Sequence, residues 1–381
     1  MASASEKLDT IWPAPAHTLA KHAVLREYLN AWFPILSTGS SYNNSEPLYI
    51  DGFAGPGEYE GGEPGSPILA ITAANVHKFD FRTPVHFLFV EKNKKRFEHL
   101  TKLVEKTSRE KGNRNIGKID VKQGECDEEI NALLDSLENK GISFGPALAF
   151  LDQFGFAGVS MELIKRILSH DKCETFIYLD YEGINRFGYI ADRAPALNRV
   201  FGNSDWLPFV TSEEKLRKFY LKSLKEHAGA EYAYAFSMFD SNGTPLNWLV
   251  FCTRHWYGMQ MMKKAMWKVD KTGSFRFSDK DDPDQLKLLE ESFDDSWLAD
   301  ELFKNLQNQT LTVAQMRDYV LSETPCYLFN DAFKILEVER KAMEAVTPPS
   351  GRRKGSFVEF EGLQFKFKKY EPIFVQQEMF G

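Results

Sequence analysis

The sequence is poor in cysteine, has no excess of positive charge and contains no long apolar run. Its cysteines lie far apart, so neither a CxxC metal site nor a disulfide framework is predicted; they are Cys126, Cys173, Cys252 and Cys326. No run approaches the roughly 20 consecutive apolar residues of a membrane span, and the first residues lack the apolar segment of a signal peptide. We therefore expect a cytoplasmic protein without a metal site and without a membrane partner.

Negative charge limits the ways in which this chain can bind nucleic acid. The formal net charge of -7 argues against a protein that coats nucleic acid, because such binding comes mainly from phosphate neutralisation by lysine and arginine. The segment 346–370 is a local exception, with six cations against two carboxylates. Its consecutive cations Arg352, Arg353 and Lys354 are candidates for contact with a phosphate backbone, although a solvated basic loop explains them equally well.

The first two thirds of the chain alternate between apolar runs and helical patterns. The runs at 47–54, 84–90, 117–122, 145–152 and 174–181 are separated by helical patterns at 66–78, 92–110, 127–139 and 160–169. Two later runs, 232–239 and 246–253, flank a turn and predict an edge hairpin. This order predicts an α/β fold over 47–280, with a mostly parallel sheet of the Rossmann-like type. A helical segment within 1–46, with apolar residues at helical spacing, is expected to pack on its core.

The last third has a different pattern. Helical stretches at about 296–308, 312–322 and 328–345 precede two strand-like runs, 356–360 and 363–368. Three short helices followed by a β-hairpin are the order of elements in a winged helix. We therefore predict a winged-helix-like domain over 285–381.

A glycine-rich loop follows the first strand. The strand ends in Asp51, and the glycines after it allow the backbone to turn tightly and approach a ligand closely. A strand-tip carboxylate followed by such a turn is typical of methyltransferases, which receive there the amino acid half of S-adenosylmethionine. The predicted cofactor contacts are Asp51, Gly52, Phe53, Ala54, Gly55 and Gly57. Glu60 stands where a dinucleotide fingerprint would have its third glycine, which disfavours NAD.

Carboxylates also follow the next two strands. Glu91 ends the second strand and is placed to accept hydrogen bonds from the ribose hydroxyls of an adenosine, or to cap the following helix. Glu125 or Asp127, after the third strand, could accept from the adenine amino group, or could be plain acids at a helix N-terminus. Ser66 and Pro67 are interpreted as the N-cap and first position of the helix that follows the loop.

The fourth strand delivers a second candidate site. Enzymes that methylate base amino groups place there an acidic or amide side chain, two prolines and an aromatic ring. Asp152 and Phe154 match as the amine acceptor and the stacking face, whereas Gln153 and Gly155 depart from the pattern. An aspartate that merely closes the cofactor pocket is the alternative.

Three further groups are candidates for substrate contact. Arg186 follows the fifth strand and could hold a phosphate or carboxylate, or form a surface ion pair. His17 and Lys21 lie four positions apart on one face of the first helix, and His22 is beside them. A solvated polar helix face accounts for these three residues equally simply.

Several motifs together resemble one family, the three-Cys-motif partner proteins of bacteria and phages. They are His17-Thr18-x-x-Lys21-His22-x-x-Leu25-x-x-Tyr28-Leu29, Asp51-Gly-Phe-Ala-Gly-Pro-Gly-x-Tyr59, Gly65-Ser66-Pro67, Ile184-Asn185-Arg186-Phe187 and Met262-Lys263-Lys264-Ala265-Met266-Trp267. The resemblance covers most of the chain, although family members usually have proline at the position of Gln153. It implies a partner encoded nearby, a three-cysteine-motif protein that looks like a radical S-adenosylmethionine or iron-sulfur protein.

Three functions remain open on the sequence. The first is an S-adenosylmethionine-dependent methyltransferase of nucleic acid, with a base amino group as a candidate acceptor and a C-terminal domain that presents a DNA or RNA strand. The second is a non-catalytic adaptor of methyltransferase ancestry that binds cofactor, nucleotide or a partner protein. The third, an NAD-dependent oxidoreductase, is disfavoured by the missing third glycine.

Overall fold

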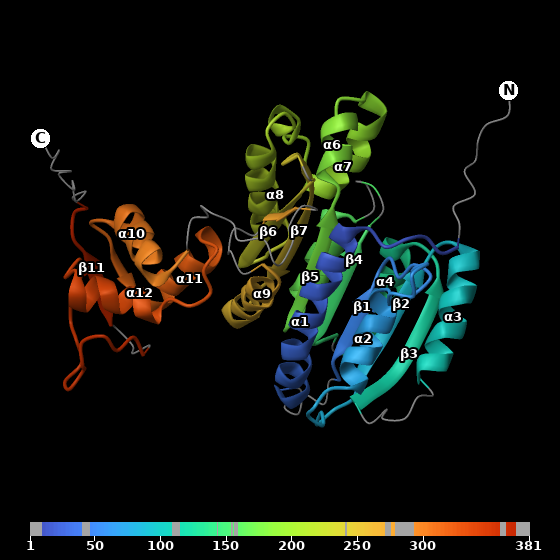
Figure 1. The fold of residues 1–381 in the computed structure, drawn as a ribbon, viewed down its shortest axis with the longest axis horizontal. Helices are drawn as coiled ribbons and strands as arrows, with labels where there is room; N and C mark the ends of the chain where they lie inside the picture. Colours follow the sequence, from blue (N-terminus) through green and yellow to red (C-terminus); the bar gives the residue numbers. More distant parts are fainter. Residues whose placement is uncertain are drawn as a thin grey trace, which may run out of the picture. The chain divides into compact units, whose positions relative to one another are not determined.

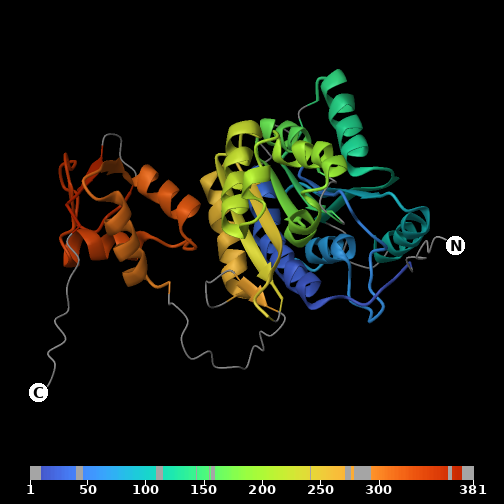
Figure 2. The same ribbon diagram turned by 90° about the horizontal axis from the view of Figure 1, so that it is seen from above.

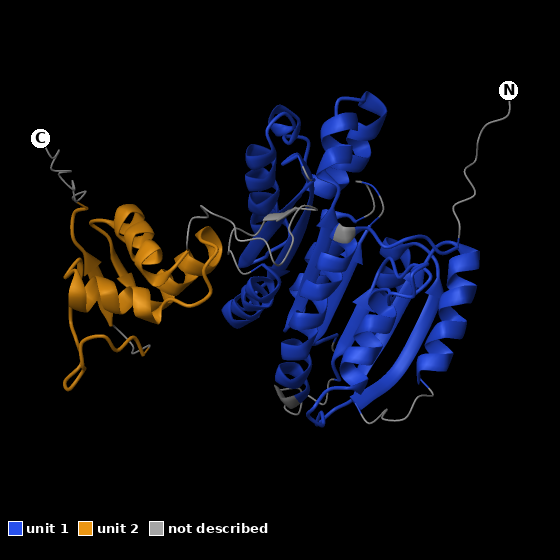
Figure 3. Cartoon of the chain, in the orientation of Figure 1, with its two compact units in different colours: residues 1–271, 275–286 blue, residues 272–274, 287–381 orange. Residues whose placement is uncertain are grey.

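A computed structural model describes residues 10–39, 46–108, 115–142, 144–153, 155, 159–240, 242–270, 276–278, 293–358 and 363–370. The chain forms two compact units (Figure 3). The first unit comprises Met1–Lys271 and Phe275–Leu286, and the second comprises Thr272–Ser274 and Lys287–Gly381. No helix in these described ranges is long and apolar enough to cross a bilayer.

An eight-stranded sheet forms the centre of the first unit, in the order β3-β2-β1-β4-β5-β7-β6-β8 (Figure 1). The central strands run parallel, and β7 is antiparallel to both of its neighbours, β5 and β6. The strands are β1 Leu48–Asp51, β2 Val85–Glu91, β3 Ile116–Gln123, β4 Ala147–Asp152, β5 Cys173–Leu179, β6 Tyr232–Phe239, β7 Pro245–Thr253 and β8 Arg276–Ser278. This confirms the predicted Rossmann-like sheet with an antiparallel edge hairpin.

Helices cover both faces of the sheet (Figures 1 and 2). They are α1 Ala16–Gly39, α2 Ser66–Asn75, α3 Lys94–Ser108, α4 Cys126–Asn139, α5 Met161–Ser169, α6 Tyr181–Phe187, α7 Ala194–Phe201, α8 Glu213–His227 and α9 Trp256–Val269. The core on the α4, α5, α7 and α8 face is largely aliphatic, whereas Tyr49, Phe150 and Phe251 point to the α1 face. The two faces differ because successive strand residues point to opposite sides.

Helix α1 is bound tightly to this sheet. Its apolar residues recur at helical spacing, and Leu25, Tyr28, Leu29, Trp32 and Phe33 are buried. Tyr28 packs against Phe251 at 5.1 Å between ring centroids and donates a hydrogen bond to Glu174. The helix also contacts α2 and α9. Its first turns therefore hold a fixed position at the carboxyl edge of the sheet, where Lys21 meets Asp152.

The second unit combines three helices with a small antiparallel sheet, in the order β10-β11-β9. Its elements are α10 Asp295–Leu306, β9 Thr310–Thr312, α11 Val313–Glu323, α12 Asn330–Lys334, a π-helical turn at Ile335–Glu339, β10 Met343–Ala345 and β11 Gln364–Phe367. Its core includes Leu302, Met316, Phe333 and Phe365. A complete capping box at Thr312 and Gln315 fixes the start of α11.

Two local predictions in the second unit are wrong. The helix predicted to reach 345 ends at the π-helical turn, because Lys341 adopts a left-handed φ of 52° and Met343–Ala345 then pairs with β11. The partner of β11 in the hairpin is therefore β10 rather than a strand at 356–360; residues 356–358 form no strand, and 359–362 lie outside the described residues.

Candidate cofactor and acceptor site

Three carboxylates gather at one edge of the sheet. Asp51, Glu91 and Asp152 end β1, β2 and β4, which are neighbours in the sheet. Open α/β sheets bind their ligands beyond the carboxyl ends of the strands, so this edge is the candidate site.

Asp51 is completely buried. One carboxylate oxygen accepts a hydrogen bond from the Phe53 amide at 3.2 Å. The other oxygen, Oδ2, has no hydrogen-bond partner among the described residues. Burial raises the pKa of Asp51 to about 7, against the opposing hydrogen bond from Ser66. A buried carboxylate oxygen without a donor suits a ligand that brings a cation.

Ser66 does not cap α2. The N-cap is Gly65, and no side chain caps the helix there. Ser66 lies inside the first turn, where its hydroxyl acts to lower the pKa of Asp51 against the larger effect of burial. The predicted N-cap role of Ser66 is therefore wrong.

The glycines of the loop meet different demands. Gly55 has a φ of 62°, and a Cβ added there would meet no atom within 4 Å, so its open side can face a ligand. Gly52 is needed for packing, because a Cβ would lie 2.5 Å from Cys126 Sγ. Gly57 has a φ of 90° and accepts a 2.7 Å hydrogen bond from the Gly65 amide. Phe53 is half-buried and Ala54 buried, and the Ala54 amide donates to Val90.

Glu91 ties this loop to the neighbouring strand. Its oxygens accept hydrogen bonds from the Gly55 amide at 2.9 Å and from the Asn93 amide at 2.7 Å. Each carboxylate oxygen has a second lone pair, so Glu91 keeps the capacity to accept from a ligand hydroxyl.

A cavity of about 820 Å³ opens beside Glu91. It is also lined by Gly52, Phe53, Glu125 and Gly155. Of the two acids proposed to contact adenine, Glu125 lines the cavity and pairs with Lys92 at its rim, whereas Asp127 is engaged by Ser160 and Arg199. Ligand pockets for small molecules span roughly 300 to 1,000 Å³, so the space suits an adenosine.

Asp152 is paired with Lys21. The Lys21 ammonium donates to Asp152 Oδ2 and lies 4.4 Å from the centroid of the Tyr178 ring. The Lys21 and Asp152 side chains are only 5% and 17% exposed. The sequence did not single out Tyr178, although an aromatic residue near the tip of β5 was visible. One oxygen of Asp152 is therefore already engaged, and the role of Asp152 as amine acceptor remains a prediction.

A small cavity of about 20 Å³ adjoins this pair. Asp152 lines it together with Gly55, Tyr59, Ser66 and Trp12. Its lining residues come both from the glycine loop, which is expected to hold the cofactor, and from Asp152, which is expected to face the methyl acceptor. The space between them is narrow in this conformation.

His22 lies close to the same pair. Its ring packs against Tyr59, with 5.9 Å between ring centroids, and burial followed by the nearby Lys21 charge lowers its pKa to about 4. His22 is therefore neutral at pH 7. His17 is half-buried and has interactions of its own. The predicted substrate roles of His17, Lys21 and His22 remain predictions.

The loop after β4 is only partly described. Phe154, the predicted stacking residue, lies outside the described residues. Gln153 is buried, and its Oε1 accepts a 2.9 Å hydrogen bond from the Val159 amide. Where the base-amine pattern has proline, Gln153 thus supplies a side chain that accepts from the backbone six positions later.

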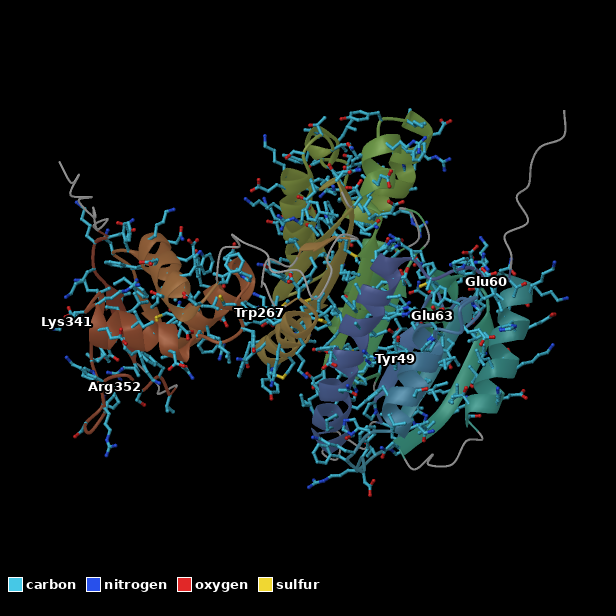
Figure 4. All side chains as sticks on the ribbon, in the orientation of Figure 1. Tyr49, Glu60, Glu63, Trp267, Lys341 and Arg352 are labelled. Atoms are coloured by element: carbon cyan, nitrogen blue, oxygen red, sulfur yellow. The ribbon has the colours of Figure 1, made fainter. Side chains whose placement is uncertain are left out.

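Two arginine side chains that were predicted to contact an anion differ in their surroundings. Arg186 is exposed, with its guanidinium 5.2 Å from the centroid of the Phe187 ring, so it remains accessible to an anion. Arg352, which is labelled in Figure 4, belongs to the second unit. Its side chain is only 3% exposed and forms a two-pronged ion pair with Glu337, at 2.7 and 2.8 Å. The expectation that Arg352 contacts phosphate is therefore wrong, because its side chain is buried and both of its terminal Nη groups are bonded to Glu337. Arg353 and Lys354 are exposed.

Comparison with solved structures finds only weak similarity. No protein-family model and no curated protein matches the sequence. A Trm1 structure from Pyrococcus horikoshii in complex with S-adenosyl-L-methionine is 10% identical, with a TM-score of 0.35 and coverage of 93% of this chain and 94% of that one. A human methyltransferase 10 domain-containing protein is 14% identical, with a TM-score of 0.33 and coverage of 63% and 85%. A precorrin-6y C5,15-methyltransferase from Geobacter metallireducens is 10% identical, with a TM-score of 0.29 and coverage of 56% and 84%.

The strand order decides the fold class. Placing antiparallel β7 between β5 and β6, beside β4-β1-β2-β3, is the arrangement of Rossmann-like methyltransferases. The first unit is methyltransferase-like. At such low identities and scores the solved structures assign no activity, which has to be argued from the residues of this chain.

Proposed function

We propose that this protein binds S-adenosylmethionine and transfers its methyl group to nucleic acid. The observation that carries the proposal is the buried, unpartnered Oδ2 of Asp51 at the start of a loop in which Gly55 has an open side. A cationic α-amino group is the ligand feature that such an oxygen lacks. NAD offers no α-ammonium to Asp51.

The residues present fit the cofactor in a definite order. Asp51 would receive the α-ammonium group, Gly55 would let the backbone approach it, and Glu91 would accept from the ribose hydroxyls. Glu125 and Gly155 line the part of the 820 Å³ cavity that suits the adenine. When bound, the cofactor supplies an electrophilic methyl group on a sulfonium centre.

The second unit would present the nucleic acid as a winged helix. Its order of elements, helix, strand, two helices and two strands, supports this topology, as does the central place of β11 in the sheet. Arg353 and Lys354 lie exposed in the long connection between β10 and β11, where a wing would be. A protein-binding wing is the alternative.

The non-catalytic adaptor is a second candidate, favoured by one observation. Asp152 is occupied by Lys21, and only about 20 Å³ of space adjoins it. In that function, cofactor binding would regulate contact with a partner, and the three-cysteine-motif protein implied by the family resemblance is the first to test. Leu328 in the second unit is an apolar side chain that is 61% exposed. Co-expression and affinity capture with that protein, with Leu328→Asp as a surface variant, tests this association.

A transfer assay distinguishes the two functions. The full chain would be incubated with methyl-labelled S-adenosylmethionine and RNA or DNA, alone and with the three-cysteine-motif protein. Label in nucleic acid that is lost in Asp51→Asn supports the methyltransferase. Cofactor binding without transfer, under every combination, supports the adaptor.

A further inference from the structure

The Lys21–Asp152 pair places a positive charge beside the strand-tip carboxylate of the candidate acceptor site. Lys21 reaches the tip of β4 from α1, and its ammonium is held between the Asp152 carboxylate and the face of Tyr178. Both partners attract a cation, so together they fix the position of the ammonium group. One oxygen of Asp152 is thereby taken, and the other remains for an acceptor.

This arrangement is poorly suited to a base amino group. An exocyclic amine needs acceptors for its two N–H groups, and its nitrogen gains positive charge as the new bond to carbon forms. The Lys21 ammonium competes for Asp152 and opposes that positive charge. The predicted amine role of Asp152 therefore conflicts with its neighbour.

A hydroxyl acceptor has the opposite requirements. It carries one proton, which a single free carboxylate oxygen can accept, and its oxygen gains negative charge as the proton leaves. A buried ammonium one carboxylate away stabilises that charge. The other groups around the pair are Asp51 on β1, His22 on α1 and Tyr59 in the glycine loop.

We propose that the methyl acceptor is a hydroxyl oxygen, and that within nucleic acid it is the ribose 2′-hydroxyl of RNA. The inference rests on the proposed function. The hydroxyl proton passes to Asp152, the oxygen lone pair forms the bond to the methyl carbon, and the carbon-sulfur bond breaks with its electron pair left on sulfur. Asp152 then releases the proton to water. Lys21 is a positioning residue that orients and neutralises Asp152.

The proposal narrows the substrate class. DNA lacks the 2′-hydroxyl, so the same site would leave it unmodified. The test is incubation of the full chain with labelled S-adenosylmethionine and RNA or DNA, followed by digestion to nucleosides and mass spectrometry. We expect 2′-O-methylnucleosides from RNA and no modified nucleoside from DNA.

Variants separate chemistry from folding. Asp152→Asn should lower kcat by about 100-fold or more, with affinity for S-adenosylhomocysteine within about threefold of wild type. Lys21→Met should behave similarly and Lys21→Arg should restore part of kcat, whereas Lys268→Met, which breaks an exposed α1–α9 ion pair, should change neither quantity. A binding readout accompanies these rates: RNA should bind more tightly than a fully 2′-O-methylated copy, and Asp152→Asn should remove the difference.

Each remaining outcome counts against a defined claim. A methylated base nitrogen made by the wild type overturns the hydroxyl acceptor and leaves the methyltransferase intact. Wild-type kcat in Asp152→Asn overturns the role of the pair. Binding of S-adenosylhomocysteine without transfer to any RNA or DNA overturns the acceptor proposal in favour of the adaptor. Absence of cofactor binding overturns the proposed function itself.

Discussion

Lys21 and Asp152, 131 positions apart in the sequence, form a largely buried ion pair at the carboxyl edge of the central sheet. The pair joins the helix that precedes the sheet to the tip of β4. The pair therefore links the position of α1 to the charge at the candidate acceptor site. Its contribution can be measured as unfolding free energy and as kcat.

Breaking this pair should destabilise the first unit. Lys21→Met removes the cation and leaves the Asp152 charge mostly buried, which should cost about 3 kcal/mol of unfolding free energy. Lys268→Met is the control, because its partner Glu27 also lies on α1 but the lysine is 56% exposed, and the expected loss is below about 1 kcal/mol. Urea denaturation measures both. Equal, small losses would show that the Lys21–Asp152 pair contributes little.

The raised pKa of Asp51 makes its contribution to stability depend on pH. The folded pKa is about 7 and the unfolded value 3.8, so the folded state binds more protons between these values. Stability from Asp51 is therefore fully present below about pH 4 and is lost as pH rises through 7. The unfolding free energy of wild type relative to Asp51→Asn should fall by up to about 4 kcal/mol over that range. If the difference in unfolding free energy between wild type and Asp51→Asn stays constant from pH 4 to 8, the pKa of Asp51 is not raised in the folded state.

Two glycines in the loop should respond differently to the same substitution. Gly52→Ala forces a Cβ to within 2.5 Å of Cys126 Sγ and should lower stability by about 1 to 3 kcal/mol. Gly55→Ala meets no atom within 4 Å and should cost only about 1 kcal/mol of backbone strain at its φ of 62°. Because its open side faces the expected ligand, Gly55→Ala should weaken cofactor affinity more than it weakens folding. Thermal denaturation and calorimetry of each variant decide this.

We expect Arg352 to stabilise the second unit and its two neighbours, Arg353 and Lys354, to bind RNA. Arg352→Met should lower the stability of the second unit by about 3 kcal/mol, because Glu337 would be left buried without a partner. The double variant Arg353→Ala, Lys354→Ala should leave stability unchanged, weaken RNA binding and flatten the dependence of log affinity on log salt by up to about 2 units. An unchanged salt slope would assign the wing to a protein partner.

The parallel sheet was predictable because each central strand is a nearly continuous apolar run, buried on both faces. The strand tips followed from those runs, so Asp51, Glu91 and Asp152 could be named from sequence. The ion pair of Asp152 could not, because nothing local to Asp152 indicates a residue 131 positions away. Likewise, Met343–Ala345 is too short to give a strand pattern, and the buried Glu337 partner of Arg352 was hidden inside an apparently continuous helix.

The most direct test of the cofactor site is a calorimetric titration of the full chain with S-adenosylmethionine, S-adenosylhomocysteine and NAD. We expect both sulfur-containing ligands to bind at one site per chain and NAD not to compete. Asp51→Asn and Glu91→Gln should each weaken affinity by roughly tenfold or more, while Glu128→Gln, an exposed acid in the first turn of α4, should not. No binding of either sulfur-containing ligand, or unchanged affinity in both site variants, would contradict the account.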